Sequence, residues 1–139
     1  FSKKKVPLSW GGSFEVDATS TDGRIVACVS TSQHRTAGGR AGIGKIQKIR
    51  SDALFLLHIA GAKRRLLIFT DPDMYRHFSQ EQQHGRFPPS GDVELLIVQL
   101  PDDLSATLDA ARLTASQEVS PRDGQPSRRK RGKRPAQLR

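Results

Sequence analysis

Hydrophobic and polar residues alternate in the segment "SFEVDATS", residues 13–20. Phe14 and Val16 fall on one face of an extended chain, and Glu15 and Asp17 fall on the other. A period of two is typical of a strand with one buried face, so the pattern predicts a half-buried β-strand.

Three further segments are apolar runs, which predict buried strands. They are "IVACVST" (25–31), "RRLLIFT" (64–70) and "DVELLIVQL" (92–100). The dipeptide Asp22-Gly23 precedes the first of these runs and is a strong signal for a tight turn. The first two strands are therefore expected to form an antiparallel hairpin.

Three segments place apolar residues at helical spacing. The first covers residues 44–61 with Gly61 as its C-cap, the second covers 71–85 with Asp71 as its N-cap, and the third covers 102–118. The apolar positions of the first and third helices are Ile46, Ile49, Ala53, Leu56, Leu57 and Ala60, and Leu104, Leu108, Ala111 and Ala115.

The resulting order is β-β-α-β-α-β-α. Strand–helix–strand units give parallel strand pairs through right-handed crossovers. We therefore predict an α/β domain with a mixed sheet, in which an N-terminal antiparallel hairpin leads into parallel strands and helices cover both faces. This domain is expected over residues 13–118, between a basic N-terminal extension (1–12) and a disordered basic tail (119–139).

The positive charge of the chain is concentrated at its ends. The 139 residues carry a net charge of +9, of which the tail holds +7 and Lys3–Lys5 hold +3, which leaves −1 for residues 6–118. The tail has too few apolar residues to offset the entropy of ordering it. Its cations suit contact with phosphates, although a solubilising tail or a nuclear localisation signal has the same composition.

Other features narrow the class of protein. A single cysteine, Cys28, excludes an internal disulfide and a Cys-rich zinc site. No apolar run approaches the roughly 18 residues of a membrane helix, and no signal-peptide pattern is visible. These features predict a soluble, cytoplasmic protein without a membrane partner.

The segment "GGRAGIGKI" (38–46) has the spacing of a phosphate-binding P-loop at Gly39, Gly44 and Lys45. However, Ile46 stands where a P-loop needs a Ser or Thr hydroxyl for magnesium. The loop also begins about seven residues after its strand, where the motif requires a tight strand–loop–helix turn. Both features argue against a nucleotide site.

A stronger pattern lies in the hairpin "FEVDATSTDGRIVACVSTS". Asp17 ends one strand, and Cys28 and Ser30 share a face of the next strand because they are two residues apart. This arrangement resembles the restriction-endonuclease-like (PD-(D/E)XK) nucleases, in which an acid precedes a strand carrying Glu or Asp, one hydrophobic residue and Lys. The resemblance covers roughly residues 13–100 and implies a similar core fold and a Mg²⁺ or Mn²⁺ site for phosphodiester hydrolysis.

The chain departs from that pattern, because Cys28 and Ser30 stand at the family's second acid and lysine positions. Glu15 faces the same way as the first acid and is expected to supply the second metal ligand. A lysine of the following helix, Lys45 or Lys48, is expected to replace the missing lysine. The resemblance thus implies a degenerate or rearranged site with the candidate catalytic residues Asp17, Glu15 and Lys45, of which Asp17 and Glu15 would bind the metal.

Residues 33–50 hold five cations and no acid, directly beyond a strand end where ligands of open α/β sheets bind. The Gly-rich loop suits phosphates because its backbone amides can face a ligand. A solvated helix face explains its lysines equally well. The expected nucleic-acid contacts are Arg35, Arg40, Lys45 and Lys48, and in the tail Arg128, Arg129, Lys130 and Arg131.

Several of these residues also have a purely structural explanation. Asp17 fits a turn former, and Cys28 fits a small core residue. His58 fits a core or helix-end histidine, whereas His77 and His84 are expected to be solvated on a polar helix.

The preferred interpretation is a phosphate-backbone-binding domain with weak or lost metal-dependent phosphodiesterase activity, which binds DNA in preference to RNA. The alternative is a non-catalytic scaffold or protein-interaction module within a larger protein. Both are compatible with a homodimer or a larger assembly.

Overall fold

The structure, a computed structural model, describes residues 2–119 of the chain. Of the predicted tail (119–139), Val119 is the last residue of a helix, and residues 120–139, with the four expected contacts, lie outside the described residues. The chain divides into two compact units, Phe1–Asp102 and Asp103–Arg139. The elements are β1 (Ser2–Pro7), β2 (Ser13–Thr19), β3 (Ile25–Ser30), α1 (Ile43–Leu57), β4 (Arg64–Phe69), α2 (Pro72–Gln83), β5 (Glu94–Ile97) and α3 (Asp102–Val119).

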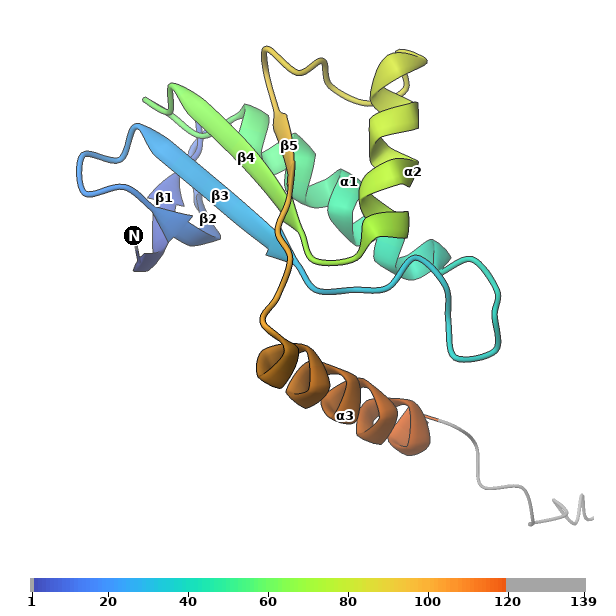
Figure 1. Ribbon diagram of the computed structural model, residues 1–139. Coiled ribbons are helices and arrows are strands. Elements are labelled where there is room, and N and C mark those ends of the chain that lie inside the picture. Colours follow the sequence, from blue (N-terminus) through green and yellow to red (C-terminus); the bar gives the residue numbers. More distant parts are fainter. Residues whose placement is uncertain (1, 120–139) are drawn as a thin grey trace, which may run out of the picture. The chain divides into compact units, whose positions relative to one another are not determined.

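The first unit is built on a five-stranded mixed sheet with the order β1-β2-β3-β4-β5 (Figure 1). The β1–β2 and β2–β3 pairs are antiparallel, and the β3–β4 and β4–β5 pairs are parallel. The predicted hairpin leading into parallel strands is therefore confirmed. The sheet also includes β1, so residues 1–12 are not a mere extension: Lys5 and Val6 pair with Glu15 and Phe14 of β2.

The tight turn of the hairpin forms as its sequence predicts. The Ser20 hydroxyl donates to Oδ1 of Asp22 at 2.7 Å, and the backbone N–H of Ser20 donates to the Ile25 carbonyl at 2.9 Å. The ladder between β2 and β3 is nevertheless short, because it pairs only Ala18 with Ala27 and Thr19 with Val26. The residues of β2 before Ala18 thus do not pair with β3.

Helices α1 and α2 pack on the same face of the sheet, so the expectation of helices on both faces is wrong for this pair. Consecutive parallel strands in the order β3-β4-β5 require both right-handed crossovers to pass over one face. Figure 1 shows α1 passing behind the strands. The core on that face joins strand residues to helix residues, among them Cys28, Leu67 and Phe69 from the strands, Ile49, Ala53 and Leu56 from α1, and Met74 and Phe78 from α2.

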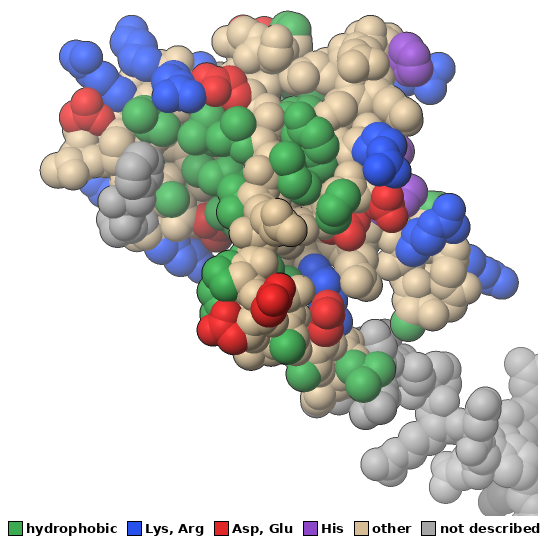
Figure 2. Space-filling view, viewed as in Figure 1, with side chains coloured by type: hydrophobic (Ala, Val, Ile, Leu, Met, Phe, Trp, Pro, Cys, Tyr) green, Lys and Arg blue, Asp and Glu red, His purple; other side chains and the backbone are tan. Residues whose placement is uncertain are grey.

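The opposite face of β3, β4 and β5 is also apolar. Val29, Ile68 and Leu96 are Cα partners across the three strands and so share this face. Val29 and Leu96 are 40% and 39% exposed. Figure 2 shows hydrophobic side chains gathered over the strands on the side turned to the viewer.

Helix α2 follows the predicted capping pattern closely. The Asp71 carboxylate accepts the Met74 N–H at 2.9 Å, and Pro72 occupies the first helical position. Gly85 follows the helix with a φ of 70°, a left-handed conformation that glycine adopts without strain. The sequence therefore determines both ends of this helix locally.

Helix α1 ends earlier than predicted, because its C-cap is His58 and not Gly61. The Arg65 guanidinium of β4 donates to the carbonyl oxygens of Leu56 (2.6 Å) and Ile59 (3.3 Å), which satisfies the end of the helix. The following residues are drawn to β1, since the N–H of Ala60 donates to the Pro7 carbonyl at 3.1 Å. Tertiary contacts thus override the local glycine signal.

Helix α3 forms over the predicted segment. In the second unit it carries an ion pair between Arg112 and Asp109 at 3.0 Å. Leu104 of its predicted apolar stripe is 53% exposed. None of the helices within residues 2–119 is long and apolar enough to cross a membrane.

Candidate functional site

The candidate acid Asp17 lies where the backbone pairing between β2 and β3 ends, and its side chain continues the contact between the two strands. Its Oδ2 accepts the backbone N–H of Val29 at 2.8 Å. This bond replaces one that a longer ladder would have supplied to β3. Asp17 is exposed, so its carboxylate keeps access to solvent while it holds the strand.

The charge of Asp17 acts on two lysines, Lys3 of β1 and Lys48 of α1. The Lys48 ammonium lies 2.8 Å from Oδ2 of Asp52, one helical turn further along α1. The hydrogen bond with Asp52 raises the pKa of Lys48, and the charges of Asp52 and Asp17 act in the same direction. We call Asp17, Cys28, Lys48 and Asp52 the hairpin–helix cluster.

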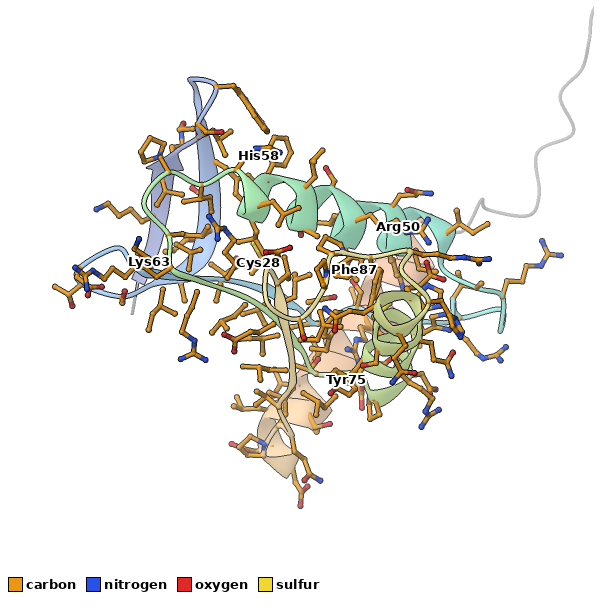
Figure 3. All side chains as sticks on the ribbon, turned by 90° about the horizontal axis from the view of Figure 1, so that it is seen from above. Cys28, Arg50, His58, Lys63, Tyr75 and Phe87 are labelled. Atoms are coloured by element: carbon orange, nitrogen blue, oxygen red, sulfur yellow. The ribbon has the colours of Figure 1, made fainter. Side chains whose placement is uncertain are left out.

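Cys28 lies inside this cluster as a buried, neutral thiol. Burial raises its pKa to about 12, and the charges of Asp52 and Asp17 raise it further than Lys48 lowers it. Figure 3 shows the residue in the interior, among the strands and beneath α1. At neutral pH the thiol is neither a nucleophile nor a ready metal ligand, which supports the plainer prediction of a small core residue.

The other two expected catalytic residues have separate environments. Glu15 forms an ion pair with Lys3 of β1 at 3.0 Å, and both side chains are about half exposed or more. Lys45 is exposed in the first turn of α1, and its side chain lies against Gly42. Of the two expected lysines, Lys48 is the one whose pKa the charge of Asp17 raises. It is therefore the lysine of α1 for which an electrostatic interaction with the hairpin is shown.

These surroundings do not fit the expected Mg²⁺ or Mn²⁺ site. The described residues contain no group of three or more His, Cys, Asp or Glu side chains that could hold a metal ion. Glu15 forms an ion pair with Lys3, and Oδ2 of Asp17 accepts the Val29 N–H.

The Gly-rich loop between β3 and α1 is closed by its own backbone. Arg35 and Ala41 form an isolated antiparallel bridge, and the Gly42 N–H donates to the His34 carbonyl at 2.8 Å. The N–H groups of Thr36, Gly39 and Ile43 also donate to carbonyls within the loop. The expectation of loop amides facing a phosphate is therefore wrong for these groups, because they are already satisfied internally.

The cations of this region differ in how far they are neutralised. Lys48 pairs with Asp52, and Arg50 of α1 pairs with Glu81 of α2 at 3.0 Å. Figure 3 shows Arg50 on the α1 side of the molecule, well along the helix from His58. Arg35, Arg40 and Lys45 are exposed and have no acidic partner within the described part of the chain. The guanidinium of Arg35 donates to the Gly39 carbonyl at 3.0 Å, which stiffens the loop.

The carboxyl ends of β3 and β4 meet beside this loop. The backbone N–H of His34, which follows β3, donates to Oδ2 of Asp71 at 3.1 Å, and Asp71 follows β4. The same carboxylate oxygen caps α2. One acid thus fixes the loop to the start of α2, at the edge where open α/β sheets bind ligands.

The fold is that of an α/β protein with a mixed five-stranded sheet. The chain matches no protein-family model, no curated protein and no solved structure. Function must accordingly be inferred from the residues of the site, because an α/β fold is compatible with many activities.

Proposed function

We propose that this domain handles nucleic acid by contacting the phosphate backbone through the loop between β3 and α1. The observation that carries the proposal is the set of exposed cations Arg35, Arg40 and Lys45, which lack acidic partners in the described residues beside the carboxyl ends of β3 and β4. Fixed cations near one another release counterions from a polyanion, and this release favours binding.

The closed loop supports this role in a different way from a P-loop. The N–H groups of Thr36, Gly39, Gly42 and Ile43 are occupied, so the proposal assigns the contact with phosphates to the side chains. The internal hydrogen bonds and the link from His34 to Asp71 hold the loop backbone that carries those side chains. A preformed site loses less conformational entropy on binding than a flexible one.

The restriction-endonuclease-like fold and a degenerate phosphodiesterase centre remain part of the proposal. Asp17 keeps the position of the family's first acid, and Lys48 from the crossover helix interacts with it electrostatically. The neutral Cys28 thiol stands at the second acid position. This combination favours backbone binding with weak or lost cleavage, and a DNA duplex is the nucleic acid with which the proposal is tested.

The proposal predicts a specific loss of DNA binding when the loop cations are removed. In the full chain, the double variant R40Q/K45Q should weaken binding to a DNA duplex, measured by fluorescence anisotropy at several salt concentrations. The slope of log affinity against log salt should fall by about 0.9 for each phosphate that the variant no longer neutralises. The matched control R24Q/K63Q removes the same charge at the start of β3 and beside the start of β4, and it should keep the slope of the unmodified chain.

Two results would argue against this role of the loop. One is an equal loss of binding in both double variants, which would mean that only net charge matters. The other is complete loss of binding on neutralising Arg128, Arg129, Lys130 and Arg131 with the loop intact, which would place the binding in the tail.

A cleavage assay on the full chain distinguishes a nuclease from the alternative, a scaffold or protein-interaction module. Cleavage of the duplex with Mg²⁺ or Mn²⁺ that is abolished in Asp17→Asn would identify an enzyme. Asn keeps an acceptor for the Val29 N–H and removes the charge, so it tests chemistry more than stability. A domain that neither binds nor cleaves nucleic acid would favour the scaffold, for which the apolar face around Val29 and Leu96 is the supporting observation.

A further inference from the structure

A small polar pocket lies between the loop after β3 and one side of α2. Its volume is about 210 Å³. The loop contributes His34 and Arg35, and α2 contributes Asp73, Arg76, His77 and Gln80. The hairpin–helix cluster shares none of these residues, and the pocket has only Arg35 in common with the cations of the proposed backbone contact.

The imidazole rings of His34 and His77, two of the residues that line the pocket, lie next to each other. The ring centroids of His34 and His77 are 4.9 Å apart, with the ring planes tilted by 38°. The polar helix pattern predicts a solvated His77, but the residue is half-buried and its Nε2 is fully buried without a hydrogen-bond partner in the described residues. A buried ring nitrogen without a partner is costly, so the free protein has an unsatisfied polar group beside this pocket, which a ligand satisfies only if the ring turns toward it.

The charges around the two rings favour an anion. Arg35 and Arg76 bring two guanidinium groups, and the single acid, Asp73, is already paired with Arg76 at 2.9 Å. Burial lowers the pKa of His77, and the neighbouring His34 lowers it further. The charge of Glu81 opposes these effects, and Arg50, which is paired with Glu81, acts in the same direction as His34.

We propose that this pocket binds a phosphate group, with His34, His77, Arg35 and Arg76 as its donors. A phosphate oxyanion presents several acceptors, which suits two imidazole N–H groups and two guanidinium forks. The amide of Gln80 adds a neutral donor at the rim.

Binding should be coupled to proton uptake by His77. The pKa of His77 lies below its ordinary value of 6.5 in the free protein, so the ring is neutral at pH 7. A bound anion stabilises the imidazolium form and raises that pKa. A phosphate monoester also takes up a proton in this range, with a second pKa of about 6, so the coupling is measured as the rise in the His77 pKa and not as a change of affinity with pH.

Histidine ring resonances in the NMR spectrum of the full chain test this inference directly. The ring resonances of all four histidines are followed in inorganic phosphate and in chloride at equal ionic strength. Phosphate should shift the ring resonances of His34 and His77, raise the pKa of His77, and leave the ring resonances of His58 and His84 unchanged. Unchanged resonances at His34 and His77, or equal shifts at all four residues, would overturn the proposal.

The variant Asp73→Asn separates an anion site from a cation site. Removing this carboxylate frees Arg76 and deletes a repulsive charge, so phosphate should bind several-fold more tightly. A divalent cation held by the histidines would instead bind more weakly, and such a result would refute the anion site. Arg76→Gln should weaken phosphate binding by about tenfold, whereas the matched control Arg86→Gln should not.

The source of the phosphate is distinguished by a second titration. A short 5′-phosphorylated oligonucleotide is compared with its 5′-hydroxyl counterpart. A shift at His34 and His77 only with the phosphorylated strand would identify a nucleic-acid end, and a shift only with inorganic phosphate would identify a free anion. R40Q/K45Q removes two of the three proposed backbone contacts and leaves the pocket unaltered, including the shared Arg35. Loss of duplex binding with phosphate binding retained therefore distinguishes this inference from the proposed function.

Discussion

The Asp17 carboxylate combines a structural and an electrostatic role in one side chain. It accepts the Val29 N–H where the β2–β3 ladder stops, and its charge affects the pKa values of both Cys28 and Lys48. A hydrogen bond to a charged acceptor contributes more than a neutral one. Any variant at this position must therefore be tested for folding as well as for activity.

Cys28 should be unreactive in the folded chain. With a pKa of about 12 and a side chain that is 3% exposed, it has almost no thiolate at pH 8. Ellman's reagent should label the native protein far more slowly than the protein unfolded in guanidinium. Native labelling as fast as that of the unfolded chain would contradict the buried, neutral thiol.

Among single residues, those with local roles could be predicted from the sequence. The capping role of Asp71 follows from its place before Pro72 and a helical pattern. The engagement of Glu15 by Lys3 could not be predicted, because the lysines of residues 3–5 do not indicate a strand. The choice of Lys48 over Lys45 depends on how α1 is rotated above the sheet, and periodicity alone does not define that rotation for a polar position.

At the scale of elements, Asp71 connects three segments. Its Oδ2 accepts the Met74 N–H of α2 and the His34 N–H of the loop after β3. Asp71→Ala should lower the free energy of unfolding by about 1–2 kcal/mol, measured by urea denaturation. The cost arises because two backbone donors lose their acceptor.

The neighbouring acid Asp73 provides the control. It is exposed and pairs only with the exposed Arg76, so Asp73→Ala should cost about 0–1 kcal/mol. An equal loss of stability in the two variants would contradict the special role of Asp71.

The elements that the sequence predicts least well are those shaped by distant contacts. β1 consists largely of lysines, which are unusual in strands, and it forms because β2 offers an edge for pairing. The end of α1 moves from Gly61 to His58 because Arg65 of β4 binds the last carbonyls. Helices α1 and α2 lie on the same face of the sheet because of the order of the strands in it. The order of helices and strands along the chain does not specify the order of the strands in the sheet.

For the whole molecule, the distribution of charge is more informative than its total. The net charge of +9 reflects both ends of the chain, yet the cations without acidic partners in the described residues include a group beside the carboxyl ends of β3 and β4. Several other cations of the first unit are paired, as Arg64 is with Glu94 at 2.8 Å. The loop after β3 is thus where backbone phosphates are expected.

The most direct test of backbone binding by the folded domain is to map DNA binding on the full chain by amide NMR. On addition of a DNA duplex, we predict the largest shifts at residues 33–48, around Arg40 and Lys45, and little change near Arg24 and Lys63. Shifts confined to residues 120–139, with the loop unaffected, would contradict the claim that the folded domain itself contacts the phosphate backbone.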